Sequence, residues 1–242
     1  MYQTLKLMIC TIPCLLLATG CNTVVSKKSP PISHIHVGHT LTGWAATPDK
    51  KGLITTAEQE AAIVMANSQK AKKAGSLTEK KKYMANALHA LDPKAQKSGP
   101  GRGYGLTRAM IESIAHLQFA ASSPDASANI KRTVPIIAGK AQKLSGAANQ
   151  LKVFAQAAKG ASSEPEADAL IGEFMKTAAQ LNGSYSIAAF KKDIQSMVQK
   201  ERPAYQTVDS YYLFNLIRLP SGAWGFASGN KHDSHDDDGG SY

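Results

Sequence analysis

One long apolar pattern constrains the fold of this chain more than any other feature. Between residues 130 and 158, apolar side chains recur at alternating steps of four and three residues. They are Ile130, Val134, Ile137, Ala141, Leu144, Ala148, Leu151, Ala155 and Ala158. This is a heptad seam of branched and small side chains, typical of closely packed helix bundles. It predicts a helix over residues 124–159, which at 1.5 Å per residue would be about 54 Å long.

Helix-start signals lie on both sides of this segment. A Ser or Thr followed three residues later by Glu occurs at Thr55, Ser76 and Ser163, and Ser123 directly precedes Pro124. Together with apolar stripes, these signals predict further helices over residues 57–74, 76–91, 106–122, 163–181, 187–197 and 205–218. Residues 33–53 show no helical period, residues 223–226 read as a short extended segment, and no sustained strand period occurs. We therefore expect an all-α bundle of six or seven helices, with the long helix at its centre and an irregular N-terminal loop.

The first 21 residues have the pattern of an export signal. Lys6 precedes an apolar run over residues 7–17, and Ala18-Thr19-Gly20-Cys21 follows. This segment resembles the signal peptide and lipobox of bacterial lipoproteins. The resemblance implies that residues 1–20 are removed, that Cys21 is lipidated, with palmitate among its acyl chains, and that the protein faces the periplasm. Asn22 is not the Asp that favours the inner membrane, so the resemblance implies the outer membrane. The alternative is an ordinary secretory signal that leaves Cys21 as a thiol.

The cysteines and the polar segments divide the chain. Of the three Cys, Cys10 and Cys14 lie in the signal, so the body can contain neither a disulfide nor a Cys-ligated metal. Residues 21–33 read as a tether, residues 34–229 as the helical domain, and residues 230–242 as a disordered acidic tail. The tail contains two His and four Asp, which could bind a divalent cation weakly or simply be a solvated terminus.

Positive charge is concentrated in one part of a chain whose net charge is +10. Residues 70–102 contain nine Lys and Arg against two acidic residues. Six of these residues surround a predicted helix–helix junction: Lys70, Lys72, Lys73, Lys80, Lys81 and Lys82. The last three occupy a predicted first turn, where the helix dipole disfavours cations. They are candidates for docking on an anionic surface or a protein partner, and the alternative is ordinary solvated lysines. Export argues against nucleic acid as a partner.

Clustered histidines are the strongest candidate for chemistry. His34, His36 and His39 lie within six residues, close to Trp44. In an extended segment, His34 and His36 would point to the same side. Neutral imidazoles suit Cu, Zn, Ni or Fe, or an axial bond to non-covalent haem. The alternative is a loop whose His side chains bind the backbone or pack on Trp44.

Helical-wheel positions separate the other two histidines of the body. His116 lies on the flank of an apolar stripe, one turn after Glu112, which makes it a candidate fourth ligand. His89 lies opposite the stripe of its own helix, so we expect it to be exposed and a poor ligand. The glycine-rich segment 98–105 lacks the ending of a nucleotide-binding loop. Three interpretations stay open: a hinge, an anion-binding helix entrance that uses Arg102 and Arg108, and a plain connection.

Sequence signatures of common enzymes are missing, including zinc-protease, serine-hydrolase, c-type haem and di-iron patterns. The sequence therefore favours a lipid-anchored, periplasm-facing accessory protein without catalysis of its own. We expect such a protein to carry a transition-metal or haem site in the histidine cluster. Two alternatives remain open: an exported metalloenzyme, and a purely structural or interaction scaffold.

Overall fold

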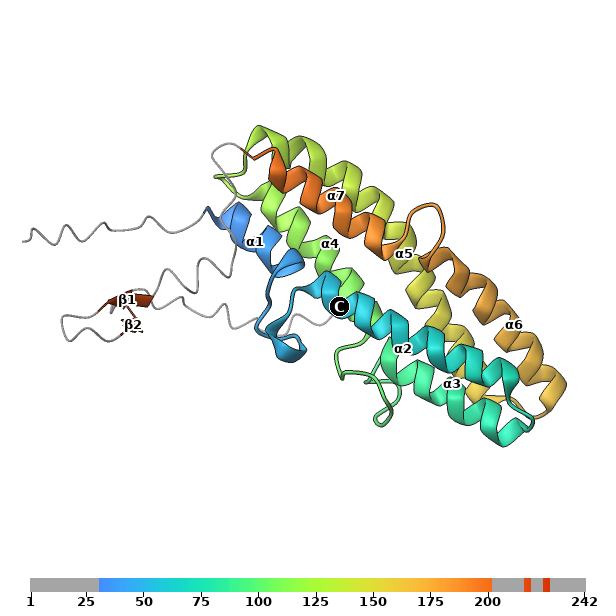
Figure 1. Ribbon diagram of the computed structural model, residues 1–242. Coiled ribbons are helices and arrows are strands. Elements are labelled where there is room, and N and C mark those ends of the chain that lie inside the picture. Colours follow the sequence, from blue (N-terminus) through green and yellow to red (C-terminus); the bar gives the residue numbers. More distant parts are fainter. Residues whose placement is uncertain (1–30, 202–215, 219–223, 227–242) are drawn as a thin grey trace, which may run out of the picture.

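The computed structural model describes residues 31–201, 216–218 and 224–226. Within residues 31–201 the chain is an all-α bundle, as predicted, and its helices lie side by side (Figure 1). They are α1 (Ile32–Leu41), α2 (Leu53–Lys73), α3 (Leu77–Leu91), α4 (Leu106–Ser122), α5 (Ala128–Gly160), α6 (Glu164–Leu181) and α7 (Ile187–Gln199), with a short 3-10 turn at Pro48–Lys50. Among the described residues, no helix is long and apolar enough to cross a membrane.

Helix α5 is the central element that the heptad pattern predicts. Every residue of the seam is buried, and none is more than 3% exposed. The helix contacts α3, α4, α6 and α7 (Figure 1). Its predicted start was four residues too early. Ser127, rather than Ser123, accepts the capping hydrogen bond, from the N–H of Ile130 at 3.0 Å. Ser123 instead donates to the carbonyl of Phe119 at 2.8 Å, at the end of α4.

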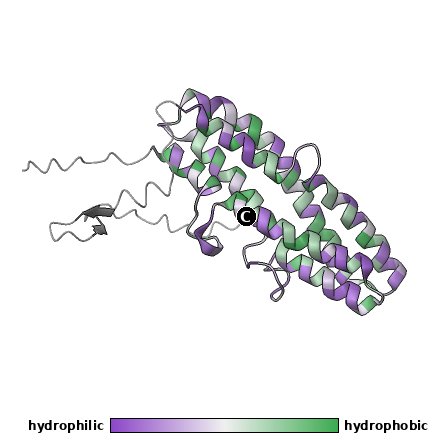
Figure 2. Cartoon of the chain, in the orientation of Figure 1, coloured by the Kyte–Doolittle hydropathy of each residue, from purple (hydrophilic) through white to green (hydrophobic). Residues whose placement is uncertain are grey.

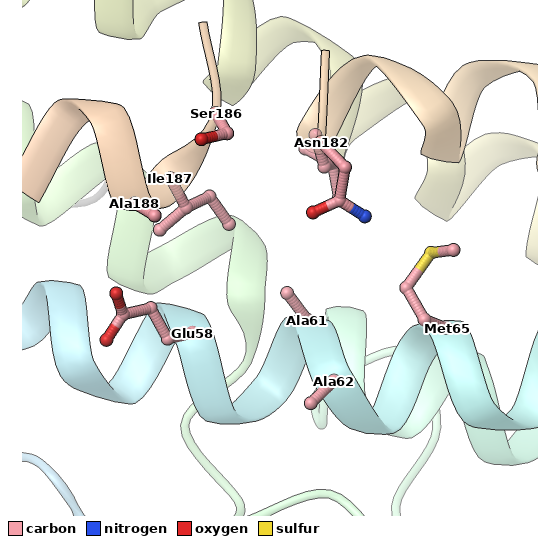
Figure 3. Close-up of a pocket in the computed structure, with 9 residues that line it drawn as sticks. Glu58, Ala61, Ala62, Met65, Asn182, Ser186, Ile187 and Ala188 are labelled. Carbon is pink, nitrogen blue, oxygen red and sulfur yellow. The ribbon is translucent and has the colours of Figure 1, made fainter.

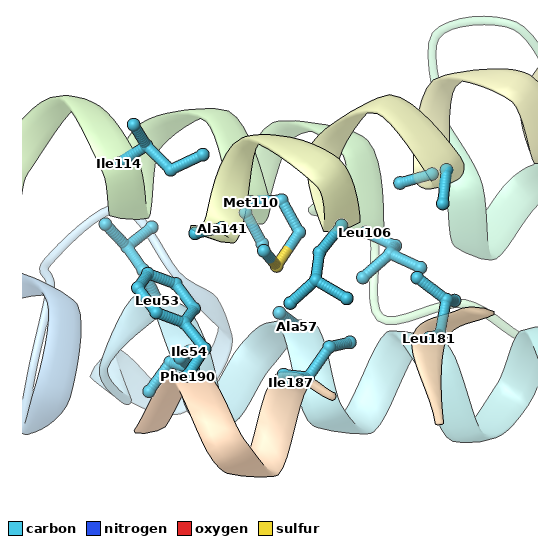
Figure 4. Packing of buried hydrophobic residues seen from close by; sticks show 14 of the residues in the cluster. Leu53, Ile54, Ala57, Leu106, Met110, Ile114, Ala141, Leu181, Ile187 and Phe190 are labelled. Carbon is cyan, nitrogen blue, oxygen red and sulfur yellow. The ribbon is translucent and has the colours of Figure 1, made fainter. Parts of the chain in front are cut away.

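The apolar faces of the helices meet in one continuous core. Figure 4 shows Leu53 of α2, Met110 of α4 and Phe190 of α7 directed into the same interior, and all three are fully buried. Hydrophilic residues cover much of the outer surface of the helices (Figure 2). Burial of these side chains, at roughly 25 cal/mol per Å² of apolar surface, is the main stabilising term for a body without a disulfide.

Of the three helix starts predicted from a Ser or Thr followed by Glu, the N-caps of two are confirmed and the third is wrong. Ser76 and Ser163 accept hydrogen bonds from backbone N–H groups three residues later, at the starts of α3 and α6. Thr55 does not cap α2, which begins at Leu53. The carboxylate of Glu58 is used elsewhere, because it lies 2.7 Å from Nζ of Lys191 on α7.

The expected irregular N-terminal loop is wrong for residues 32–41, which form α1. The residue that caps the N-terminus of α1, Asp125, is distant in the sequence. The carboxylate of Asp125 accepts hydrogen bonds from the first two N–H groups of α1, with 3.0 Å to that of Ser33. Partial burial raises the pKa of Asp125, but these hydrogen bonds outweigh it and hold the pKa below its usual range. A helix capped from another part of the fold gives no local sequence signal.

The C-terminal part is described only in two short strands. Strand β1 (Leu216–Arg218) pairs antiparallel with β2 (Trp224–Phe226), with Leu216 opposite Phe226. The predicted helix over 205–218 is therefore wrong at residues 216–218, and residues 205–215 lie outside the described residues. The extended segment expected at 223–226 is confirmed over Trp224–Phe226. The predicted signal peptide, Cys21 and the predicted acidic tail also lie outside the described residues.

Candidate metal centre

Three imidazoles from two helices converge beside α1. His36 and His39 are three residues apart on α1, so they share one face of the helix, and that face meets His116 of α4. Nδ1 of His36 lies 3.2 Å from Nδ1 of His116. Nδ1 of His39 lies 3.4 Å from the same atom. One possible ligand atom from each residue falls within 4.8 Å of the other two, so the three can share one ion.

The distances fit a small metal ion. For metal–nitrogen bonds of about 2.0–2.1 Å at tetrahedral angles, two ligand nitrogens are about 3.3–3.4 Å apart. The His36–His116 and His39–His116 separations, 3.2 and 3.4 Å, are close to this value. Two of the three ligand–ligand edges therefore already have the spacing of a tetrahedral site. Without metal, an imidazole pair at these distances can share a proton in an N–H···N hydrogen bond.

Aromatic side chains form the walls of the cluster. The Trp44 ring lies 4.3 Å from the His39 ring and 4.8 Å from the His116 ring, between centroids. The Phe119 ring lies 5.5 Å from that of His36. His39 is 8% exposed, whereas His36 is partly exposed, so the cluster borders solvent on the His36 side. Packing on Trp44, the alternative to a metal role in the interpretation of the sequence, is observed for His39 and His116.

His34 does not join the cluster. The run of histidines is helical rather than extended, and at 100° per residue His34 lies about 160° from His36 around the axis of α1. Its Nε2 lies 3.2 Å from the carboxylate of Glu201, and both side chains are almost completely buried. Glu201 also accepts hydrogen bonds from Oγ of Ser127 and from Nδ2 of Asn129. The expectation that His34 and His36 point to the same side was therefore wrong.

A polar group adjoins the cluster on α4. Glu112, one turn before His116, accepts a hydrogen bond from Nε of Arg108 at 2.6 Å and another from the hydroxyl of Tyr104. Burial, with the hydrogen bond and negative charge of Glu112, raises the pKa of the Tyr104 hydroxyl. An interaction with the Trp44 side chain opposes this rise in the pKa of Tyr104. Glu112 therefore has both oxygens engaged within the chain.

The backbone of the glycine-rich segment binds a carboxylate of the protein itself, that of Glu60. Glu60 of α2 is fully buried, and its carboxylate accepts hydrogen bonds from the N–H groups of Arg102, Tyr104 and Gly105 at 3.0–3.3 Å. Gly103 and Gly105 have φ of 88° and 89°, a conformation that favours glycine. Sequence reasoning missed Glu60, which looks like one more polar residue of an amphipathic helix.

The same segment covers His89, which is 7% exposed rather than exposed as expected. A Cβ at Gly99 would lie 2.6 Å from Cβ of His89, so the absence of a side chain at residue 99 allows the close approach. His89 is not a member of the metal-ligand cluster found among the described residues.

The six lysines divide into two groups. Lys80 is 6% exposed, and its Nζ lies 2.8 Å from the carboxylate of Asp168 on α6. Nζ of Lys81 donates to the carbonyl of Ala161 at 2.9 Å, at the end of α5, where the helix dipole favours a cation. Lys70, Lys72, Lys73 and Lys82 are exposed. Docking on an anionic surface stays a prediction for these four.

A shallow groove of about 220 Å³ lies elsewhere, between α2 and the α6–α7 connection (Figure 3). Glu58 and Met65 line one side, and Asn182 and Ser186 the other. The groove contains none of the histidines, so it does not belong to the candidate metal centre.

No protein-family model matches the chain, and no curated protein or solved structure is detectably similar to it.

Proposed function

We propose that this protein is a lipid-anchored accessory protein that holds a transition-metal ion at His36, His39 and His116. The observation that carries the proposal is the convergence of three Nδ1 atoms, two pairs of which have the spacing of a tetrahedral metal site. His34, the remaining histidine that the sequence named as a candidate ligand, contacts Glu201 instead.

The ligand type favours a borderline divalent ion, namely Zn²⁺, Cu²⁺ or Ni²⁺. Imidazole suits these ions, whereas Mg²⁺ and Ca²⁺ prefer oxygen ligands. Three imidazoles that converge on one point argue against haem, whose iron accepts protein ligands only at its axial positions. Three protein ligands leave one tetrahedral position for water or for a ligand from a molecule that delivers or receives the ion.

Holding an ion is a better fit than catalysis. A metal-bound water needs a general base within hydrogen-bond reach to become part of a hydrolytic mechanism. Glu112 is the carboxylate one turn from His116, and its two oxygens are engaged by Arg108 and Tyr104. An exported metalloenzyme, the alternative, predicts a turnover that chelation abolishes.

Metal titration tests the site directly. The protein used is the mature chain with the substitutions His232→Ala and His235→Ala, which remove the imidazoles of the tail as competing metal ligands. Co²⁺ added to this protein should give the absorption spectrum of tetrahedral cobalt, and the absorption should saturate at one equivalent of Co²⁺. Added Zn²⁺ should displace the Co²⁺ and remove the absorption. His116→Ala should lower the affinity at least 100-fold. His34→Gln is the matched control, because its amide N–H can replace the imidazole donor to Glu201, and it should bind with unchanged stoichiometry.

Two results would contradict the metal proposal. One is a protein that stays free of metal after incubation with Co²⁺, Zn²⁺, Cu²⁺ and Ni²⁺. The other is a His116→Ala variant that binds as tightly as the unaltered chain, because the ion would then lie elsewhere.

The lipid anchor is a separate part of the proposal and rests on the lipobox resemblance at residues 18–21. Labelled palmitate supplied to producing cells should enter the unaltered protein. Cys21→Ser should abolish the incorporation, whereas Cys14→Ser, within the signal, should leave it unchanged. Labelling that persists in the Cys21 variant would contradict lipidation at this residue.

A further inference from the structure

Helix α1 supplies two of the three candidate ligands, so the position of this helix determines the geometry of the site. An isolated helix of ten residues is marginal in water and depends on tertiary contacts. On the side of α4, Oγ1 of Thr40 donates to the carbonyl of Ser113 at 3.3 Å. At its N-terminus, α1 is capped by Asp125. On the side away from the ligands, His34 makes a polar contact with Glu201.

We infer that Glu201, acting through His34, is a positioning residue of the metal site. This inference rests on the proposed function. Glu201 fixes the rotation of α1 about its axis, so that His36 and His39 face His116. Neither Glu201 nor His34 touches the ion.

The structure makes Glu201 a rigid point of attachment. Its side chain is fully buried, and one of its oxygens accepts hydrogen bonds from Oγ of Ser127 at 3.0 Å and from Nδ2 of Asn129. Ser127 is the N-cap of α5, so the carboxylate also lies where the dipole of the central helix favours an anion. The other oxygen lies 3.2 Å from Nε2 of His34. The contact thus connects α1 to the longest helix of the bundle.

A small rotation of α1 would be enough to disrupt the site. Side chains extend to about 5–6 Å from a helix axis, so a rotation of about 20° moves a ligand nitrogen by about 2 Å. Metal–ligand distances tolerate a deviation of about 0.2 Å. Because His34 lies on the far side of α1 from both ligands, its attachment to Glu201 opposes this rotation.

Two variants of one residue test the inference. His34→Ala removes the donor to Glu201, whereas His34→Gln keeps an N–H in its place. In the chain lacking the tail histidines, we expect His34→Ala to lower the Co²⁺ affinity at least tenfold while the stoichiometry stays at one ion. His34→Gln should bind within about threefold of the unaltered protein. Glu201→Ala should reproduce the effect of His34→Ala.

A control for general destabilisation is Ile171→Val in α6, which trims a buried side chain outside the site. It should lower the unfolding midpoint and leave the Co²⁺ affinity unchanged. Hydrogen exchange gives a second measurement that does not depend on metal. Without metal, His34→Ala should speed exchange of the α1 amides at least tenfold while the α5 amides stay protected.

The outcomes separate the inference from the proposed function. If the unaltered chain binds Co²⁺ and His34→Ala binds it equally tightly, the inference is wrong and the metal site stands. If His34→Ala and His34→Gln weaken Co²⁺ binding equally, the loss of affinity does not come from the loss of the N–H donor to Glu201, and the inference is again wrong. If the unaltered chain binds no ion, the proposed function fails, and the inference fails with it.

Discussion

The buried carboxylate of Glu60 should be one of the most sensitive single positions in the protein. It accepts hydrogen bonds from three backbone N–H groups of the glycine-rich segment, those of Arg102, Tyr104 and Gly105. A buried donor that loses its partner costs about 1–3 kcal/mol. The N–H groups of Tyr104 and Gly105 are buried and that of Arg102 is partly buried. Glu60→Ala should therefore lower the free energy of unfolding by about 2–6 kcal/mol, a large part of the roughly 5–15 kcal/mol of a typical domain.

Glu60→Gln separates the hydrogen bonds from the volume of the side chain. With its oxygen at the position of Oε1, the amide still accepts from Tyr104, from Gly105 and, at 3.2 Å, from Arg102. Its NH₂ group, however, replaces the acceptor Oε2, which lies 3.1 Å from the nitrogen of Arg102. The expected loss is about 1–2 kcal/mol. Glu58→Ala, on the same helix, is the matched control. It removes a partly exposed ion pair with Lys191 and should cost about 1 kcal/mol or less.

Urea unfolding, followed by circular dichroism, measures all three variants on one scale. Hydrogen exchange should also show faster exchange at residues 102, 104 and 105 in the Ala variant. A Glu60→Ala protein that loses less than about 1 kcal/mol would refute the reasoning, because the three amides would then have found water or other partners at little cost.

Three further predictions concern the outer parts of the bundle. Gly139→Ala and Gly146→Ala should each stabilise the protein by up to about 1 kcal/mol in urea unfolding, since an added Cβ meets no atom within 4 Å and both lie inside α5; a loss of stability would show that these glycines have a packing role. Asp125→Asn should destabilise at neutral pH. Because the pKa of Asp125 is lowered on folding, its contribution to the free energy of unfolding is present above about pH 4 and disappears as the pH falls through the folded pKa. The free energies of unfolding of the two proteins in urea should therefore converge in acid. A difference that stays constant with pH would contradict this. Lys80→Ala should lower the thermal midpoint by a few degrees and Lys82→Ala should not, because only the first lysine is buried against Asp168; equal midpoints would contradict a structural role for Lys80.

Patterns that act along one helix were predicted well. The heptad seam of α5 depends only on the spacing of apolar side chains, and every member is buried. The caps at Ser76 and Ser163 depend on a residue three positions away. Each of these signals is contained in a few neighbouring residues, so one sequence is enough to find it.

Features that depend on contacts across the fold were not predicted. Helix α1 is capped by Asp125, about 90 residues later, so its sequence showed no start signal. The same error placed His34 beside His36, because an extended segment and a helix put them on different faces. Glu60 and its amide partners lie more than 40 residues apart. The sequence named His36, His39 and His116 as candidates that lie together, but it could not show that His34 faces Glu201 instead.

The helical form of α1 also means that the folded and unfolded chains offer a metal ion different ligands. In the unfolded chain, His34, His36 and His39 are near neighbours in sequence and can bind one ion together. Folding turns His34 toward Glu201 and replaces it with His116, 77 residues beyond His39. An ion bound as proposed would therefore stabilise the protein only by the ratio of the two affinities, since binding to the unfolded chain reduces the gain. A chain that met the ion before folding would have to exchange one imidazole for another to reach the proposed site.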